Sequence, residues 1–518
     1  MEEVGVVLSP TSVDEFSFML LEGKKVAKGS YCTYTHPLVK APVLCRVFEG
    51  SAVNPEMAPL GIGASLAKRG IKLGREQEVV VMKAEALGYL AEEEGVKVFK
   101  RPDFPPLTGG SVYAASEEEV KAFRRGGGLM VEVGRDPYSG VSVALDVDSM
   151  FKGHVAVYGQ TRSGKTTFMV NLIAYASALG ARFIVLDRYG EYGPPLKGVG
   201  ALVLDGSMFR SIGDMDGASF VSMLGMDRRR KAGEVLAQAF DEVKHELRRH
   251  DRPVELLYEK AMSKVSRDAS RISAELKSAL SRGEMVLREL SKLPEEPLDV
   301  VELVKRSRVV VVDLSKERRV EWHQRIASSI IDYLSSRAIA SRGEEFAVSV
   351  VVEEAQFYAP EMAPGVPKYG DPDRSWSSLV SALSQLGGFN VGFFIVTQRP
   401  AYVSKAVLSQ CNTHVVFRLM AGADHDQVSS VTGYPKHRIA SLVSGLRDHV
   451  GFLIGMSSPF DFPVFLETYR RLHPAKATLP PSEVLRRMVE EERQLKQTPP
   501  LSLEGGGEAG SLGAMGGG

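Results

Sequence analysis

The sequence has few cysteines and no excess of charge of either sign. Its 518 residues include only three cysteines, Cys32, Cys45 and Cys411. Because their number is odd and none forms a C-x-x-C pair, they argue against a disulfide framework or a zinc site and favour a reducing compartment. Lys plus Arg and Asp plus Glu both total 64, so any nucleic-acid binding must depend on locally focused charge.

Long apolar runs are also absent. No run approaches the roughly 20 residues that a membrane helix needs, and the N-terminus lacks the charged and apolar regions of a signal peptide. We therefore expect a soluble, cytoplasmic protein with no membrane segment. A chain of this length with 44% hydrophobic and 25% charged residues can bury large cores and is typical of two or three domains.

The strongest motif is GQTRSGKT at residues 159–166, which satisfies G-x-x-x-x-G-K-[ST]. Residues 154–158 predict a strand before it and residues 167–173 a helix after it, as a phosphate-binding loop requires rather than a structural glycine-rich turn. In such a loop backbone N–H groups bind the β-phosphate, Lys165 reaches the β/γ oxygens and the Thr166 hydroxyl can ligate Mg²⁺. We expect ATP and Mg²⁺ as cofactors. The residues expected to bind the nucleotide are Gly159, Gln160, Thr161, Arg162, Ser163, Gly164, Lys165, Thr166 and Thr167.

A second chemical motif follows the apolar strand predicted at residues 348–352, which ends in Glu353 and Glu354. In P-loop ATPases the first acid of such a pair supports Mg²⁺, usually through water, and the second polarises the attacking water. We assign Glu353, together with Thr166, to the metal and Glu354 to the general base. A purely structural role for the two acids is the alternative.

Three further predicted strands end in polar residues. Asp187 and Glu191 could face the nucleotide or its metal, or could simply cap a tight turn. Gln398 is suited to sense the γ-phosphate, because a neutral amide can hydrogen-bond both a phosphate oxygen and water. Arg399 and Arg418 are catalytic candidates that could act across a subunit boundary, and their spacing does not choose between them.

The order of elements predicts an α/β protein with several domains. Short β-rich runs near the N-terminus indicate a small barrel or sandwich, and a charge-rich stretch of helical period later interrupts the strand pattern. Basic clusters in that stretch could contact DNA, although such clusters are usually solvated helix faces. The expected domains are an N-terminal β-barrel at 1–110, an ATPase core at 111–210 and 298–475, a helical insertion at 211–297, a C-terminal helical arm at 476–504 and a disordered tail at 505–518.

These motifs, in this order, resemble the HerA branch of the HerA/FtsK family of hexameric DNA-translocating ATPases. The resemblance covers nearly the whole chain. Beyond the phosphate loop after His154, it rests on DRYGEY at 187–192, EEAQ at 353–356, TQRP at 397–400 and SQCNT at 409–413. The last two segments are its most specific part.

The resemblance implies a RecA-like P-loop NTPase core with a mostly parallel sheet, preceded by a small N-terminal β-barrel of the HAS-barrel type and carrying a helical insertion. It also implies a homo-hexameric ring that moves on duplex DNA without sequence specificity and, in archaea, partnership with a NurA-type nuclease in DNA end resection and repair. Two other functions stay open. One is a DNA pump for conjugation or packaging, although those ATPases usually carry membrane helices, and the other is a slowly hydrolysing nucleotide switch that binds a protein partner.

Several positions depart from the family pattern. Arg162 and the DRY segment at 187–189 replace the usual glycine and Asp-Pro-His. Gly153 and the pair Gly387-Gly388 stand in regions where the family has arginines, and a trans-acting arginine can be worth about 10³ to 10⁵ in rate. We favour substitution by another arginine over slow hydrolysis, because the phosphate-loop lysine and the paired acids are intact. The arginines that could substitute are Arg162, Arg374, Arg399 and Arg418.

Candidate DNA contacts follow the paired acids. The segment 358–378 contains several prolines, which disfavour a long helix and predict a loop. Lys368 and Arg374 lie in it, and we expect them to contact DNA phosphates from the channel of a ring. The alternative is a surface loop that packs against a neighbouring subunit.

Overall fold

The computed structural model describes residues 2–39, 41–54, 68–69, 78–247, 249–476 and 481–497, with only the backbone for 491–497. The chain divides into two units, Met1–Ala475 and Lys476–Gly518. In the second unit the structure describes helix α17, Pro481–Gln497, and the tail predicted at 505–518 lies outside the described residues. None of the helices in the described part combines the length and apolarity that a membrane crossing requires.

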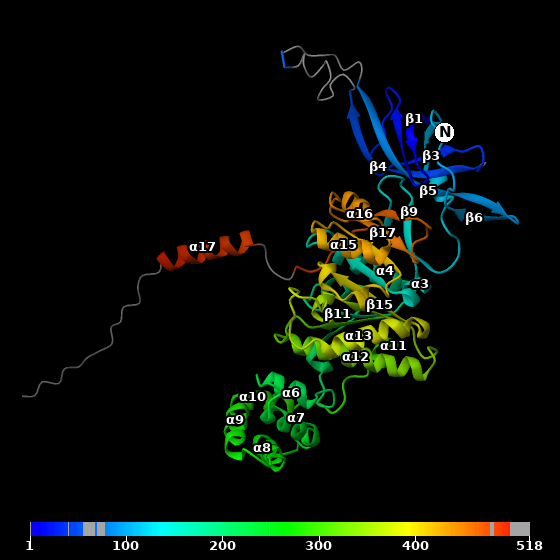
Figure 1. The fold of residues 1–518 in the computed structure, drawn as a ribbon. Helices are drawn as coiled ribbons and strands as arrows, with labels where there is room; N and C mark the ends of the chain where they lie inside the picture. The colour runs from blue at the N-terminus through cyan, green and yellow to red at the C-terminus, as the bar shows by residue number, and fades with distance from the viewer. Residues whose placement is uncertain are drawn as a thin grey trace, which may run out of the picture. The chain divides into compact units, whose positions relative to one another are not determined.

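The N-terminal strands form a closed antiparallel barrel, drawn in blue in Figure 1. Strand β7 pairs with both β1 and β3, and β2 pairs with β5, so the ring β1-β2-β5-β4-β3-β7 leaves no free edge. The barrel therefore ends at Ala114, not at residue 110 as the sequence predicted, because β7 closes it. The strands are β1 (Glu2–Thr11), β2 (Glu15–Leu20), β3 (Tyr31–Thr35), β4 (Pro42–Val53), β5 (Val79–Glu93), β6 (Val96–Lys100) and β7 (Ser111–Ala114).

The core is a sheet with the strand order β12-β13-β11-β14-β15-β10-β16-β17-β18-β8-β9 in the described residues. The strands from β12 to β16 are parallel and the others antiparallel, which confirms the predicted α/β class. Strand β15 lies between β10, which leads into the phosphate loop, and β14, which leads into the paired acids. The strands are β8 (Met130–Arg135), β9 (Ser142–Asp146), β10 (Val155–Tyr158), β11 (Phe183–Asp187), β12 (Leu202–Asp205), β13 (Val309–Asp313), β14 (Val348–Val352), β15 (Val391–Thr397), β16 (Thr413–Val416), β17 (Val450–Gly455) and β18 (Val464–Thr468).

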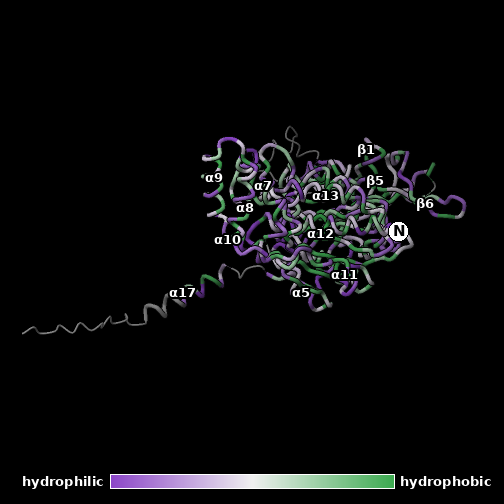
Figure 2. The backbone as a smooth tube through the Cα atoms, turned by 90° about the horizontal axis from the view of Figure 1, so that it is seen from below, coloured by the Kyte–Doolittle hydropathy of each residue, from purple (hydrophilic) through white to green (hydrophobic). Residues whose placement is uncertain are grey.

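Helices bury the parallel strands on both faces. Phe183 and Val185 of β11 belong to the hydrophobic cluster of helix α4 (Lys165–Ala178), whereas Ile184 and Leu186 belong to that of α12 (Val320–Ala340). Strands covered on both faces have continuous apolar sequences rather than alternating ones, and these strands follow that pattern. Figure 2 shows hydrophobic residues around α12. The other helices of the core are α2 (Glu117–Lys121), α3 (Val147–Gly153), α5 (Gly193–Lys197), α11 (Val300–Arg306), α13 (Asp373–Gln385), α14 (Lys405–Leu408), α15 (Gly422–Thr432) and α16 (Lys436–Val443).

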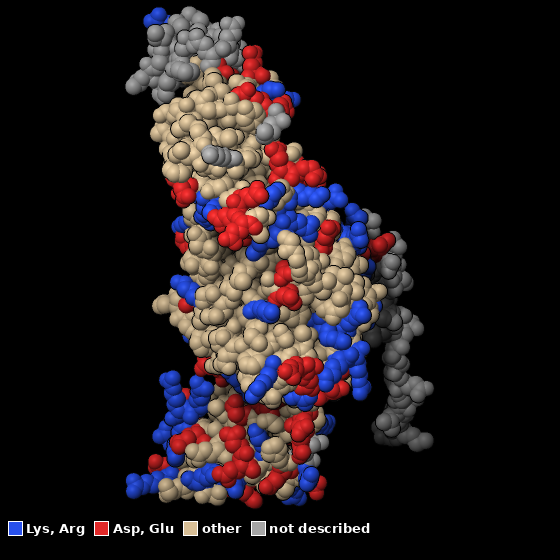
Figure 3. All heavy atoms as spheres, turned by 90° about the vertical axis from the view of Figure 1, so that its right-hand side faces the viewer, with Lys and Arg blue, Asp and Glu red and all other residues tan. Residues whose placement is uncertain are grey.

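The residues between β12 and α11 form a helical bundle with its own hydrophobic cluster, which also includes Trp322 of α12. On the face drawn in Figure 3, acidic and basic side chains are intermingled over this bundle and form no field of one sign. That mixture is typical of solvated helix faces. Its helices are α6 (Gly217–Met223), α7 (Lys231–Val243), α8 (Pro253–Ser263), α9 (Ala269–Arg282) and α10 (Glu284–Leu290).

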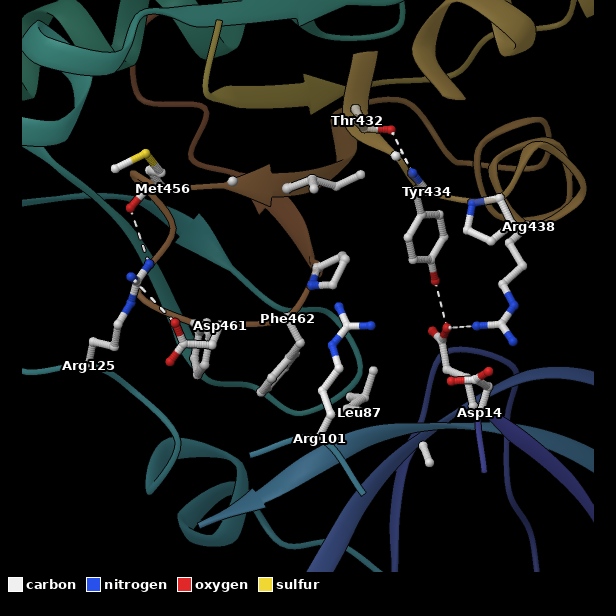
Figure 4. A pocket seen from close by; sticks show the side chains of 18 residues that line it. Asp14, Leu87, Arg101, Arg125, Thr432, Tyr434, Arg438, Met456, Asp461 and Phe462 are labelled. Carbon is white, nitrogen blue, oxygen red and sulfur yellow. Dashed lines mark hydrogen bonds and ion pairs between the residues drawn. The ribbon is translucent and has the colours of Figure 1, made fainter. Parts of the chain in front are cut away.

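A buried ionic network joins the barrel to the core. Arg46 of β4 is fully buried, and its Nε donates to Glu85 of β5 over 2.8 Å while its Nη1 donates to the Pro463 carbonyl over 2.5 Å. Tyr434 and Arg438 of the core donate to the other Glu85 oxygen over 2.6 and 2.7 Å. Burial alone would raise the pKa of Glu85, but these partners lower it. The network borders a cavity of about 570 Å³, shown in Figure 4, which none of the predicted nucleotide-binding residues lines.

Candidate active site

The phosphate loop connects β10 to α4 through residues in left-handed conformations. Gly164 has φ 113°, and a Cβ there would lie 2.8 Å from Cα of His449, so only glycine fits. The His449 amide donates to the Ser163 carbonyl over 2.8 Å, which holds the loop from the β17 side. Arg162, at φ 66°, is exposed at the loop tip. Sequence reasoning did not identify His449, because its contact with the loop spans more than 280 positions of sequence.

Lys165 is buried among carboxylates at the start of α4. Its Nζ donates to the Gln160 carbonyl over 3.3 Å. Burial lowers the pKa of Lys165, and the charges of Glu353, Glu354 and Glu191 oppose that shift. A buried ammonium of this kind is stabilised by an additional anion, so the position suits a bound phosphate.

Carboxylate oxygens that could ligate a metal ion lie near Lys165. Tyr192 donates its hydroxyl to Oε2 of Glu353 over 2.6 Å. Burial raises the pKa of Glu191, and the neighbouring Thr166 side chain opposes that shift. Burial, and then the neighbouring Glu354 carboxylate, raise the pKa of Glu353. A cation would offset both effects, and Mg²⁺ is usually held by one or two carboxylates together with substrate phosphates. The residues present therefore fit a magnesium ion, and they include Glu191, for which the sequence left a turn-capping role open.

Two glutamines hold the carboxylate of Glu354. Gln398 donates its amide to Oε1, and Gln356 donates to Oε2 over 2.6 Å. Gln398 in turn accepts from the Thr161 hydroxyl over 2.6 Å, and Gln356 accepts from Thr397 over 2.8 Å. The network thus connects the phosphate loop, the end of β14 and the end of β15. Gln356 was missed as a site residue, although it stands only two positions after Glu354.

We expect Gln356→Ala to lower the turnover rate by about 10- to 100-fold, because a hydrogen bond to a charged group contributes about 1.5–3 kcal/mol. Nucleotide affinity should change little, since Gln356 contacts the acid and not the loop. Single-turnover hydrolysis and nucleotide titration measure the two effects separately. Gln385→Ala on the exposed side of α13 is the matched control, and equal turnover in both variants would contradict a positioning role.

The two predicted catalytic arginines are engaged within the chain. The Arg399 Nε contacts Asp424 over 3.1 Å, and the Arg418 Nη2 contacts Asp448 over 2.9 Å. Arg418 meets the phosphate loop through its backbone, where its carbonyl accepts from the Gln160 amide over 3.0 Å. Neither side chain contacts the acids of the site within one subunit.

The two residues predicted to contact DNA, Lys368 and Arg374, differ in their surroundings. Lys368 is exposed before α13, whereas Arg374 lies in the first turn of that helix. Arg374 donates to the Asp214 carbonyl over 2.6 Å and approaches Asp332 to 3.7 Å, so it anchors the start of the insertion. The prediction of a loop throughout 358–378 is wrong beyond Pro372, because proline is tolerated at a helix start.

Gly153, Gly387 and Gly388, which the resemblance to HerA proteins places where arginines are usual, differ in the space around them. A Cβ on Gly387 would lie 2.2 Å from the Lys152 carbonyl, so this backbone leaves no room for any side chain there. A Cβ on Gly153 would lie 3.2 Å from Cβ of Asn412, which is tight, and one on Gly388 would meet nothing within 4 Å. The close approach of α3 to the turn at Leu386–Phe389 thus excludes a side chain at position 387.

Comparison with known proteins shows which proteins this chain is similar to. Residues 131–337 match the family described as "Helicase HerA, central domain". The DNA double-strand break repair helicase HerA of Pyrococcus furiosus is 22% identical over 536 residues, covering 91% of this chain and 93% of that protein. Its counterpart from Saccharolobus solfataricus is 23% identical over 380 residues, covering 69% and 72%.

Solved structures were also compared. VirB4 of Thermoanaerobacter pseudethanolicus is 14% identical, with a TM-score of 0.49 over 70% of this chain and 100% of that one. The plasmid coupling protein TrwB in complex with an ATP analogue is 12% identical, with a TM-score of 0.47 over 70% and 95%. In its phosphate loop, its paired strand-end acids and its sequence, the chain is similar to the HerA-type P-loop ATPases.

Proposed function

We propose that this protein is a ring-forming ATPase that uses ATP hydrolysis to move along or unwind duplex DNA. The observation that carries the proposal is the link from Thr161 through Gln398 to Glu354, which ties the phosphate loop to the acid that activates water. Relatives named as DNA double-strand break repair helicases support DNA as the substrate.

In the proposed reaction each residue has a separate task. The loop N–H groups and Lys165 bind the β/γ-phosphates, and Glu354 accepts a proton from the attacking water. Thr166 and Glu353 would hold Mg²⁺, which supplies charge neutralisation on the transferring phosphate. A bound γ-phosphate would offer the Gln398 amide another acceptor, and Gln398 would then release one oxygen of Glu354 for water.

The test is ATP turnover with and without duplex DNA. We expect DNA to stimulate the wild-type rate and Lys165→Ala to abolish nucleotide binding and turnover in both conditions. Mass photometry with and without nucleotide reports ring formation. Turnover that does not respond to DNA would argue against a translocase.

One observation favours a second candidate, a nucleotide switch that hydrolyses slowly. Gly387 excludes any side chain, so the family's arginine has no counterpart at that position. For the ring-forming ATPase, by contrast, we favour Arg162 as the arginine that contacts phosphate in a neighbouring subunit. It is exposed and has no ion pair in the described part of the chain. Slow turnover that is indifferent to DNA, together with nucleotide-dependent binding of a protein partner, would identify the switch.

A finer part of the proposal is a NurA-type nuclease partner in DNA end resection, docked on the N-terminal barrel. The barrel shares hydrophobic contacts and the Arg46–Glu85 network with the core, so deleting it would disturb the ATPase as well. Co-elution of the full chain with such a purified nuclease is therefore the appropriate measurement. If the two proteins do not co-elute, the nuclease partnership is rejected and the proposed ATPase function remains.

A further inference from the structure

Three neighbouring parallel strands, β12, β13 and β11, end side by side at the edge of the sheet where ligands bind in such folds. Each is followed by at least one cation: Arg210 follows β12, Lys316, Arg318 and Arg319 follow β13, and Arg188 follows β11. The segments are in contact, since the Leu314 amide donates to the Asp187 carbonyl over 2.9 Å. The topology therefore collects basic side chains that are far apart in the sequence.

Arg188 contacts a histidine and no described acid in this setting. Its Nη1 donates to Nδ1 of His323 over 2.7 Å, and Nε2 of His323 donates to the Glu317 carbonyl over 2.9 Å. Burial lowers the pKa of His323 to about 4, and the charges of Arg188 and Arg210 add to that effect. The histidine is therefore neutral near pH 7. Nε of Arg188 is buried without a hydrogen-bond partner, and no carboxylate pairs with this arginine among the described residues.

The loop after β13 adds three exposed cations, Lys316, Arg318 and Arg319. Lys316 is 3.5 Å from Asp205, and the other two have no ion pair in the part of the chain that the structure describes. The acids of the same segments are turned to other partners. Glu317 pairs with Arg210, Asp313 accepts from the Ser315 amide, and Asp187 accepts from backbone amides of its own turn. We call Arg188, Lys316, Arg318 and Arg319 the edge patch.

We propose that the edge patch binds the phosphate backbone of nucleic acid. The inference rests on the proposed function and gives it a DNA-binding surface that the sequence did not predict. Cations spread over two segments, with Arg188 half-buried and the other three exposed, suit a polyanion better than a single nucleotide, whose phosphates we expect at the loop of residues 159–166. Arg374, the other basic candidate near this edge, is already engaged by Asp214 and Asp332.

The decisive variant is Arg318→Ala/Arg319→Ala in the full-length protein. Its affinity for a duplex oligonucleotide should fall, and the slope of log affinity against log salt should decrease by about two, since each lost phosphate contact contributes about 0.9. The matched control is Arg229→Ala/Arg230→Ala before α7, which removes the same charge from two exposed arginines of the insertion. Fluorescence anisotropy over a salt series measures both quantities, and nucleotide affinity without DNA should not change.

The outcomes separate this inference from the proposed function. If the wild-type protein does not bind DNA, the proposed function and the inference both fall. If the wild type binds and the edge-patch variant keeps its affinity and salt slope, or loses no more than the control, only the inference is overturned. A selective loss of nucleotide affinity in the edge-patch variant would also overturn it, because the phosphates bound there would then be those of a nucleotide.

Discussion

Glu354→Gln should reduce ATP turnover by about 10²- to 10⁴-fold, the usual contribution of a positioned general base, while ATP still binds. Glutamine preserves the shape of the side chain but cannot accept the proton of the attacking water. The variant should therefore accumulate the complex with unhydrolysed ATP. Phosphate release and retention of radiolabelled ATP measure the two properties.

The matched control is Glu344→Gln, which neutralises an exposed acid just before the same strand. It should turn over ATP at the wild-type rate. A Glu354→Gln protein that is as active as this control would remove Glu354 from the role of base and leave the water to be activated by another group.

The second large effect concerns stability at the junction of barrel and core. Arg46→Leu should destabilise the protein by about 3 kcal/mol, the lower end of the 3–5 kcal/mol expected when one partner of a buried ion pair is removed. The lower end applies because Arg438 still pairs with Glu85. A lower midpoint of thermal unfolding is the measurement.

Lys83→Ala provides the control, because it breaks an ion pair of the same barrel whose two side chains are about half exposed. Such a surface pair contributes at most about 1 kcal/mol, so its unfolding midpoint should stay close to that of the wild type. Equal shifts in the two variants would show that the buried network contributes no more than a surface pair.

Motifs formed by consecutive residues were predictable from sequence. The phosphate loop needs its glycines, lysine and threonine at fixed spacing between a strand and a helix, and the paired acids need only follow an apolar strand. For the same reason the α/β class followed from apolar strand runs alternating with helical ones. Roles that depend on partners distant in sequence were not predictable in this way. Arg399 and Arg418 look equally catalytic in sequence, and only the fold shows that Asp424 and Asp448 engage them.

The sequence by itself determined the chemistry available to this protein, because the types and local spacing of residues decide which groups can bind phosphate, hold a metal or accept a proton. Only the tertiary structure decided which of these groups meet. Strand β15 lies between β10 and β14, and this order brings Gln398 into contact with both Thr161 and Glu354. Likewise β7 closes the barrel beyond its expected boundary, and β12, β13 and β11 gather the edge patch. Strand order is set by packing and pairing over long sequence separations, for which local sequence carries no signal.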